Sequence, residues 1–419
     1  MLVAERLGAL EEREFRLLWL GQSTSVFGSS LVSIALPFAV ISLTASVSAL
    51  GLVLAVGLIA RVVFLLFGGV AADRLPRQRV MLTADLLRAG TQGLVAVLLL
   101  SGHARVWHLL VLFALYGAGD AFFSPASTGL VPETVSPGRL QQANALMSLS
   151  RSTAWVAGPA LAGLIVAGAG PGWAFAIDSG TFVVSSLSLA FLRLPRAVNE
   201  APRANVLADL RGGWREVRAR TWVCTTIARF SVSNLAIAPL FVLGPFVAKH
   251  SLGGATAWGL IATCAGIGSV LGDAAALRLK PRRPLFVSGL AVSLWALEPA
   301  LLARPFPTAA IAAAAAVGFG ATSFSNALWF TALQERIPRE ALSRVSSFDW
   351  LGSLVFQQAG YAIAGPVAAA IGTSATLLAS AAVQASACIG AALTPAVRGL
   401  CAGDYPELRN AESPREARS

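Results

Sequence analysis

The chain has 419 residues, of which 56% are apolar and only 13% are charged, and its formal net charge is +11. Soluble globular domains carry about 25% charged residues, and disordered chains combine low hydrophobicity with high charge, so the composition excludes both classes. It predicts a polytopic membrane protein with room for about twelve spans of roughly 20 residues each.

Twelve apolar windows follow one another along the chain, and each is long enough to cross about 30 Å of hydrocarbon as a helix. They cover residues 17–43, 49–72, 80–100, 107–127, 144–169, 173–192, 222–248, 257–277, 285–302, 309–333, 346–370 and 375–397. Their high content of Gly, Ala and Ser favours close packing between helices. We therefore predict an all-α membrane protein with twelve transmembrane helices.

The longest polar connection divides these windows into two sets of six. We predict an N-terminal six-helix bundle at residues 1–192, a cytoplasmic linker at 193–221, a C-terminal six-helix bundle at 222–397 and a cytoplasmic tail at 398–419. Within the linker, apolar and basic residues alternate at helical spacing from Leu207 to Arg220, which indicates an amphipathic helix on the membrane surface.

The two halves repeat similar residues at a nearly constant offset. The segment that begins Phe27-Gly-Ser-Ser-Leu-Val parallels Phe230-Ser-Val-Ser-Asn-Leu, and Gly158-Pro159 parallels Gly365-Pro366. Such a repeat indicates a duplicated six-helix unit, which is typical of transporters whose binding site lies between the halves. The expected architecture is two pseudo-symmetric bundles around a central cavity.

Basic residues predict the orientation of the chain in the membrane. On the side of both termini lie 25 of the 32 Lys and Arg residues, and the other side has Arg105, Lys249 and Arg304. Cytoplasmic loops collect basic residues, so both termini are expected in the cytoplasm. A basic excess is also typical of nucleic-acid-binding proteins, but this distribution favours topology as its cause, and no nucleic-acid partner is predicted.

The connection between the second and third windows carries a recognisable motif. It runs Gly69-Val-Ala-Ala-Asp73-Arg74-Leu-Pro-Arg77-Gln-Arg79, and it resembles the loop motif of the major facilitator superfamily, G-x-x-x-D-(R/K)-x-G-(R/K)-(R/K). Pro76 replaces the second Gly and Gln78 replaces a basic residue. The resemblance implies that Gly69, Asp73, Arg74, Arg77 and Arg79 form a conformational latch between the halves; a basic loop that only fixes topology is the alternative.

Three further segments are similar to one branch of that superfamily, the bacterial exporters of drugs, siderophores and antibiotics. They are Phe15-Arg16-Leu-Leu-Trp19-Leu-Gly21-Gln22, Phe123-Ser-Pro125-Ala126 and Trp329-x-Thr331-x-x-Gln334. A fourth such segment is Arg344-Val-Ser-Ser347-x-Asp349. In the fifth window Gly158-Pro159-x-x-Ala162-Gly163 resembles an antiporter motif in which Ala162 replaces a Gly. A simple packing bend at Pro159 is the alternative.

The resemblance implies a secondary active transporter of the bacterial cytoplasmic membrane. It would export a small amphipathic or hydrophobic molecule, such as a drug or antibiotic, in exchange for protons, and so belong with antiporters of multidrug resistance. A proton-coupled symporter that takes up a small metabolite on the same fold is the alternative, because fold alone does not determine direction.

Ionisable side chains inside the hydrocarbon are costly and are candidates for function. Asp85 and Arg88 are three residues apart on one helix and are expected to pair. Arg61, near the middle of its window, needs an anion or a water-filled cavity. Proton coupling needs a carboxyl whose proton affinity changes with its surroundings. Asp120 is the first candidate, because fourth spans line the cavity in the superfamily, and Asp178 and Asp85 follow. A fixed ion-pair role is the alternative for Asp120.

Polar and aromatic residues of the first, fourth, seventh and tenth windows are candidates for the cavity wall, with ordinary packing as the alternative. They are Gln22, Ser25, Phe123, Arg229, Phe230, Asn234, Asn326, Trp329 and Gln334. The sequence has no P-loop and no nucleophile elbow, and its four cysteines are scattered, so neither an enzyme, a cofactor nor a metal site is predicted. The expected partners are a small-molecule substrate, protons and membrane lipid, with the protein a monomer.

Overall fold

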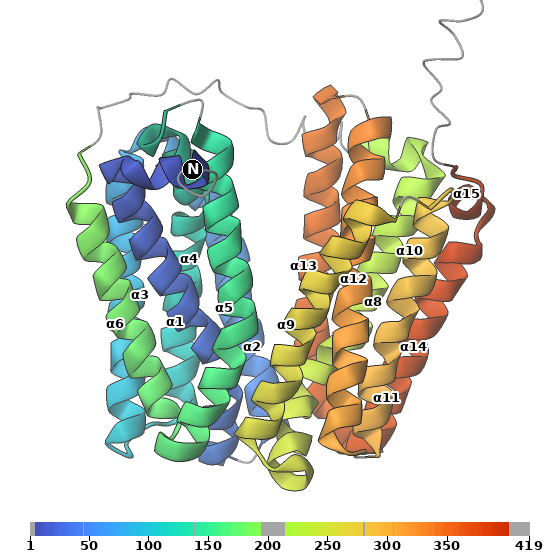
Figure 1. Cartoon of the computed structure of the whole chain (residues 1–419). Helices are drawn as coiled ribbons and strands as arrows, with labels where there is room; N and C mark the ends of the chain where they lie inside the picture. Colours follow the sequence, from blue (N-terminus) through green and yellow to red (C-terminus); the bar gives the residue numbers. More distant parts are fainter. Residues whose placement is uncertain are drawn as a thin grey trace, which may run out of the picture.

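The computed structural model describes residues 5–44, 46–136, 139–193, 214–279, 281–304, 306–337 and 339–401, and helices account for nearly all of them (Figure 1). Within these described ranges, twelve helical segments are long and apolar enough to cross a membrane. This confirms the number and order of the predicted spans.

The first six spans form one bundle, which follows the 3₁₀ segment η1 (Glu5–Glu11). Its helices are α1 (Arg13–Thr44), α2 (Val47–Arg74), α3 (Arg77–Leu100), α4 (Val106–Thr134), α5 (Leu140–Ala169) and α6 (Pro171–Ala190).

The last six spans form the second bundle, which stands beside the first in Figure 1. Its helices are α8 (Thr221–Val247) with the π-helical turn η3 (Ala248–Leu252), α9 (Ala255–Arg278), α10 (Pro284–Ser293) continuing through η4 (Leu294–Ala296) into α11 (Leu297–Ala303), α12 (Thr308–Arg336), α13 (Arg339–Ile371) and α14 (Thr373–Leu393), followed by the short α15 (Pro395–Arg398).

Several observed helices are longer than the predicted windows, such as α4, which runs to Thr134, and α13, which begins at Arg339. Two windows differ in another way, because a proline breaks or ends the helix. The ninth window is not one continuous helix: a 3₁₀ turn at residues 294–296 separates α10 from α11. Pro299 has no N–H to donate to the carbonyl of Trp295, four residues before it, so the α-helical ladder is interrupted there. The twelfth span ends at Leu393 and not at residue 397, because Thr394 precedes Pro395 and is extended, with a ψ of 138°.

Two pairs of helices make the most extensive contacts between the bundles: α2 packs against α13, and α5 packs against α9. The duplication relates the second span to the eighth and the fifth to the eleventh, so the two contacts are equivalent under one pseudo-twofold axis. Glycines make both contacts close. A Cβ atom at Gly51 of α2 would lie 2.3 Å from the carbonyl oxygen of Tyr361, and one at Gly259 of α9 would lie 2.5 Å from the carbonyl oxygen of Pro159.

These glycine contacts define what we term the contact end of the molecule, near the start of α2 and α9. We term the opposite end the linker end, since the N-terminus, residue 193 and residue 214 lie there. In Figure 1 the two bundles meet at the contact end and diverge toward the linker end.

The linker between the bundles is described only in its last part. Residues 214–219 are helical, and the ring of Trp214 lies 5.7 Å from that of Phe348, centroid to centroid. Val217 is buried. The first part of the predicted amphipathic helix, residues 207–213, lies outside the described residues, as does the tail after residue 401.

Candidate functional site

Four charged side chains meet inside the N-terminal bundle, and we call them the charge cluster. They are Arg61 of α2, Asp85 and Arg88 of α3, and Asp120 of α4. Asp120 accepts from the Nε atom of Arg61 at 2.9 Å and from the Nη1 atom of Arg88 at 3.3 Å. Two carboxylates and two guanidinium groups thus alternate across three helices, and their formal charges cancel.

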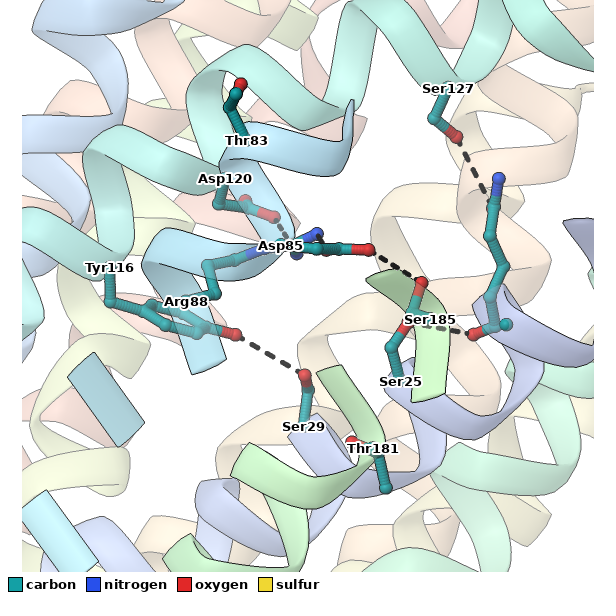
Figure 2. Close-up of polar contacts among 12 residues, drawn as sticks. Ser25, Ser29, Thr83, Asp85, Arg88, Tyr116, Asp120, Ser127, Thr181 and Ser185 are labelled. Carbon is teal, nitrogen blue, oxygen red and sulfur yellow. Dashed lines mark hydrogen bonds and ion pairs between the residues drawn. The ribbon is translucent and has the colours of Figure 1, made fainter. Parts of the chain in front are cut away.

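Arg88 is the centre of the charge cluster. It is 5% exposed, and it pairs with Asp85, as the i, i+3 spacing on one helix face favours. Its guanidinium carbon lies 4.0 Å from the ring centroid of Phe123 and 4.5 Å from that of Phe182, which adds cation–π attraction to the ion pairs. Figure 2 shows Arg88 between Asp85 and Asp120.

Asp85 is fully buried and is held from a second helix as well. The hydroxyl of Ser185 on α6 donates to its Oδ2 atom at 2.6 Å, a contact drawn in Figure 2. With both carboxylate oxygens partnered, Asp85 is suited to a fixed position. Asp120 is more accessible, because 19% of its side chain is exposed, and Arg61 beside it has 44% of its side chain exposed.

Asp178 of α6 lies near the charge cluster but has no cation of its own. It is fully buried, and the hydroxyl of Ser29 donates to its Oδ1 atom at 3.3 Å. Tyr116 lies next in the chain of contacts, with its hydroxyl 3.4 Å from that of Ser29 (Figure 2). Among the described residues no Arg or Lys pairs with Asp178, and its Oδ2 atom has no partner.

The C-terminal bundle contains an equivalent hydrogen bond between its first and sixth spans, made by an uncharged side chain in place of Asp178. Ser233 of α8 donates to the Oε1 atom of Gln384 on α14 at 2.7 Å, just as Ser29 of α1 donates to Asp178 of α6. In both halves a serine of the first span reaches a side chain of the sixth, and both residues are offset by close to 205 positions. An uncharged amide therefore makes in one bundle the contact that a carboxyl makes in the other.

The C-terminal bundle has a smaller polar group near the linker end. Arg229 is buried, with its Nη2 atom 3.4 Å from the hydroxyl of Ser325 and its guanidinium 4.3 Å from the ring of Phe230. The indole N–H of Trp329 donates to Asp349 at 2.9 Å. Phe230 also packs on Trp329, so these cavity candidates contact one another.

Most of the predicted cavity residues lie inside the bundles in this conformation. Gln22, Ser25, Phe123, Arg229 and Trp329 are buried, Phe230 and Asn234 are half-buried, and Asn326 is exposed. The buried members pack between helices in this conformation. The side chain of Gln334 lies outside the described part of the chain.

The predicted latch is described in part, since the side chains of Gly69, Asp73 and Arg74 are not. Arg77 pairs with Glu133 of α4 at 2.7 Å, and Arg79 is exposed. Gln78, which replaces a basic residue of the motif, donates from Nε2 to the carbonyl oxygens of Leu189 and Leu192 at 2.7 and 3.0 Å. The neutral amide of Gln78 thus satisfies carbonyl groups at the C-terminal end of α6, which have no partner within the helix.

The Gly158-Pro159 motif lies within an uninterrupted α5 and makes room for two neighbours. A Cβ atom at Gly158 would lie 1.8 Å from the hydroxyl oxygen of Ser30 on α1, and one at Gly163 would lie 2.8 Å from the carbonyl oxygen of Ala255 on α9. The motif therefore contributes to packing within the bundle and between the bundles.

Sequence reasoning missed the hydroxyl partners Ser29, Tyr116 and Ser185, and it missed the ion-pair partner Glu133. Single hydroxyls in apolar helices are common, so nothing in the sequence distinguishes these three. Glu133 carries a weak signal, because it is an acidic residue close to the end of a span and opposite a basic loop.

Comparisons with known proteins place this chain among transporters. The family model of the Major Facilitator Superfamily matches residues 18–353. The enterobactin exporter EntS of Salmonella choleraesuis is 28% identical over 88% of this chain and 88% of its own length. The multidrug efflux pump Tap of Mycolicibacterium fortuitum is 28% identical over 85% of this chain and 89% of its own.

Macrolide efflux protein A of Streptococcus pyogenes is 22% identical over 58% of this chain, which spans 60% of that protein's length. Among solved structures, the nucleoside transporter NupG superposes with a TM-score of 0.72 at 14% identity, over 90% of this chain and 98% of that one. A bacterial homologue of the lysosomal transporter Spinster, inward-facing and unoccupied, gives 0.67 at 15% identity, over 92% and 95%.

Proposed function

The chain belongs to the Major Facilitator Superfamily and is a multi-pass membrane transporter, and from this premise we propose that it exports a small amphipathic or hydrophobic molecule in exchange for protons. Its place is the bacterial cytoplasmic membrane, with both termini in the cytoplasm, where it works as a monomer within the lipid.

The direction and the class of cargo are supported by the curated relatives. Their names describe efflux of macrolides, export of enterobactin and efflux of several drugs. The cargo we propose for this chain is a drug, antibiotic or other secondary metabolite. The fold by itself supports neither export nor uptake, because a nucleoside transporter shares it.

The observation that carries proton exchange is the bridging of Asp120 by two arginines on different helices, beside the unpaired Asp178. The surroundings of this carboxyl therefore depend on how α2 and α3 pack against α4. Arg61 belongs to α2, which also packs against α13 of the other bundle. When the bundles rearrange and α2 moves, Asp120 loses one cation and takes up a proton.

Asp178 is the second proton site in this mechanism. A buried carboxyl without a cation is more stable as the neutral acid. In the C-terminal bundle the equivalent hydrogen bond from a serine goes to the neutral side chain of Gln384. Asp85 keeps a fixed position in this mechanism, since Arg88 and Ser185 contact both of its oxygens.

The alternating-access cycle we propose uses the two bundles, residues 1–192 and 222–397, as its moving parts. With the termini in the cytoplasm, the contact end faces outward and the present conformation is inward-facing. The motif from Gly69 to Arg79 lies at the linker end, where it latches the halves when that end closes; the Arg77–Glu133 pair orients it.

Proteoliposomes with an imposed pH gradient test this function. The wild-type protein should drive dyes and macrolides uphill only when protons flow down their gradient in the opposite direction. Asp120→Asn should lose uphill export but keep downhill exchange. Glu335→Gln, which changes an exposed carboxyl of α12, is the matched control. Export of the whole panel with no gradient, or substrate movement in the same direction as protons, would overturn the proposal.

A further inference from the structure

The C-terminal bundle contains a buried carboxyl that the mechanism above does not use. Glu298, in the short helix α11, is 2% exposed. The only hydrogen bond described for its side chain comes from the indole N–H of Trp295, which donates to Oε2 at 3.1 Å.

No opposite charge faces this carboxyl from the described helices packed around it. The elements that contact α11 are η4, α8, α12 and α14. Residues 230–247 of α8, residues 308–333 of α12 and the whole of α14 contain no Arg, Lys, His, Asp or Glu. The titratable side chains of these helices lie toward the linker end, at Cys224, Arg229, Glu335, Arg336 and Cys388.

Burial of an unpaired carboxylate is far more costly than burial of the neutral acid. One indole donor offsets only part of that cost, since a single hydrogen bond replaces the several that water makes to a carboxylate. Glu298 therefore takes up a proton in this conformation. Its closest cation along the chain is the exposed Arg304, six residues later.

The carboxyl lies next to a break in its own helix. The 3₁₀ turn at residues 294–296 separates α10 from α11, and Pro299 follows Glu298 directly. A 3₁₀ stretch within a longer helix often marks a hinge. Trp295, which donates to Glu298, belongs to this turn. A change in the charge of the carboxyl therefore acts directly on a residue of the hinge.

Trp295 connects the hinge to the contact end. It lies on the backbone of α12, where a Cβ atom at Gly318 would be 2.5 Å from its Cδ1 atom, and its ring packs on Phe319 with centroids 4.9 Å apart. Phe241 of α8 then links Trp295 to Tyr361 of α13, at centroid distances of 6.5 and 6.3 Å. The backbone of Tyr361 contacts α2 of the other bundle at Gly51.

We propose that Glu298 is a proton-binding site of the C-terminal bundle and that its protonation holds the contact end closed. Ionisation draws water toward the carboxylate, displaces Trp295 from its aromatic neighbours and loosens α13 against α2. A surface depression at the contact end brings solvent to the same helix; it is lined by Ala303, Arg304, Phe306, Pro307 and Ser374. The proposal rests on the proposed proton exchange only for its role in transport, because protonation and closure are measured without cargo.

Infrared spectroscopy of the purified full-length protein tests the protonation. At neutral pH the wild-type protein should show a carboxylic-acid carbonyl band that is missing in Glu298→Gln and unchanged in the control Glu335→Gln. Gln has nearly the same shape as the neutral acid and accepts the same indole hydrogen bond, so the variant should fold. Identical acid bands in wild type and Glu298→Gln across the titration would overturn the assignment.

Distance measurement between the bundles tests the closure. Nitroxide labels at Thr44 and Ala375, both exposed at the contact end, are introduced after the four native cysteines are replaced by alanine. The distance between the labels should lengthen as pH rises in otherwise wild-type protein and stay short at every pH in Glu298→Gln. If the pH response persists in that variant, Glu298 does not control the contact end, whether or not the protein exports a drug.

Discussion

Removing Arg88 should destabilise the protein far more than removing an arginine at its surface. In Arg88→Met the cation is lost but Asp85 stays fully buried, with only the hydroxyl of Ser185 as a described partner. Breaking a buried ion pair by deleting one partner costs about 3–5 kcal/mol. Asp120 retains Arg61 at 2.9 Å, so the stranded charge is that of Asp85 alone.

The double variant Arg88→Met/Asp85→Asn separates charge from packing. It removes the stranded carboxylate as well, and replacing a whole buried pair by neutral groups is close to neutral in stability; most of the loss should therefore return. Arg13→Met is the surface control, since Arg13 is half-exposed and pairs with Glu14, a kind of pair that contributes about 0–1 kcal/mol.

The assay is thermal unfolding of detergent-solubilised protein, together with the folded yield on size-exclusion chromatography. The expected order of stability is Arg13→Met, then the double variant, then Arg88→Met. If the double variant is as unstable as Arg88→Met, the loss comes from the rings of Phe123 and Phe182 that the guanidinium covers, and the stranded-charge reasoning is refuted.

Asp178→Asn should fold normally, because the uncharged amide of Gln384 accepts the equivalent hydrogen bond in the C-terminal bundle. The variant should alter the pH dependence of uphill export in proteoliposomes; an unchanged profile would exclude Asp178 as a proton site. Gly259→Val should block transport while the protein remains folded, because its Cβ atom would lie 2.5 Å from a carbonyl oxygen of α5; Gly390→Val, with open space around it, is the control for normal transport. Arg77→Gln should slow transport and not insertion by removing the 2.7 Å pair with Glu133, and wild-type rates would contradict a role in the latch.

The spans could be predicted from sequence because hydrocarbon imposes one simple requirement, a run of about 20 apolar residues. All twelve windows correspond to observed spans. The interruption of the ninth span could have been anticipated from Pro299, but a proline in a membrane helix does not always break it: α5 runs through Pro159 without interruption. The local sequence therefore does not determine whether the helix breaks at Pro299.

The charge cluster could be predicted only within one helix. The spacing of Asp85 and Arg88 determines that they share a face, and depth in the membrane indicates that Arg61 needs an anion or a water-filled cavity. That the anion is Asp120, and that Ser185 holds Asp85, depends on how α2, α3, α4 and α6 pack together. Helix packing in lipid is determined by small residues and shape, and these leave no pattern that one sequence reveals.

The glycine-lined crossings between the bundles bear on how fast the transporter can turn over. At Gly51 and Gly259 the backbone of one helix lies directly against the backbone of another. Moving one bundle away from the other at these points therefore separates few interlocked side chains and requires few rotamer changes. A crossing built from large side chains would have to unpack a layer of them at each half-cycle, forfeiting the dispersion contacts that close packing provides. In the alternating-access cycle proposed above, the two equivalent crossings can part with little rearrangement of side chains, which keeps the activation barrier for opening the contact end low.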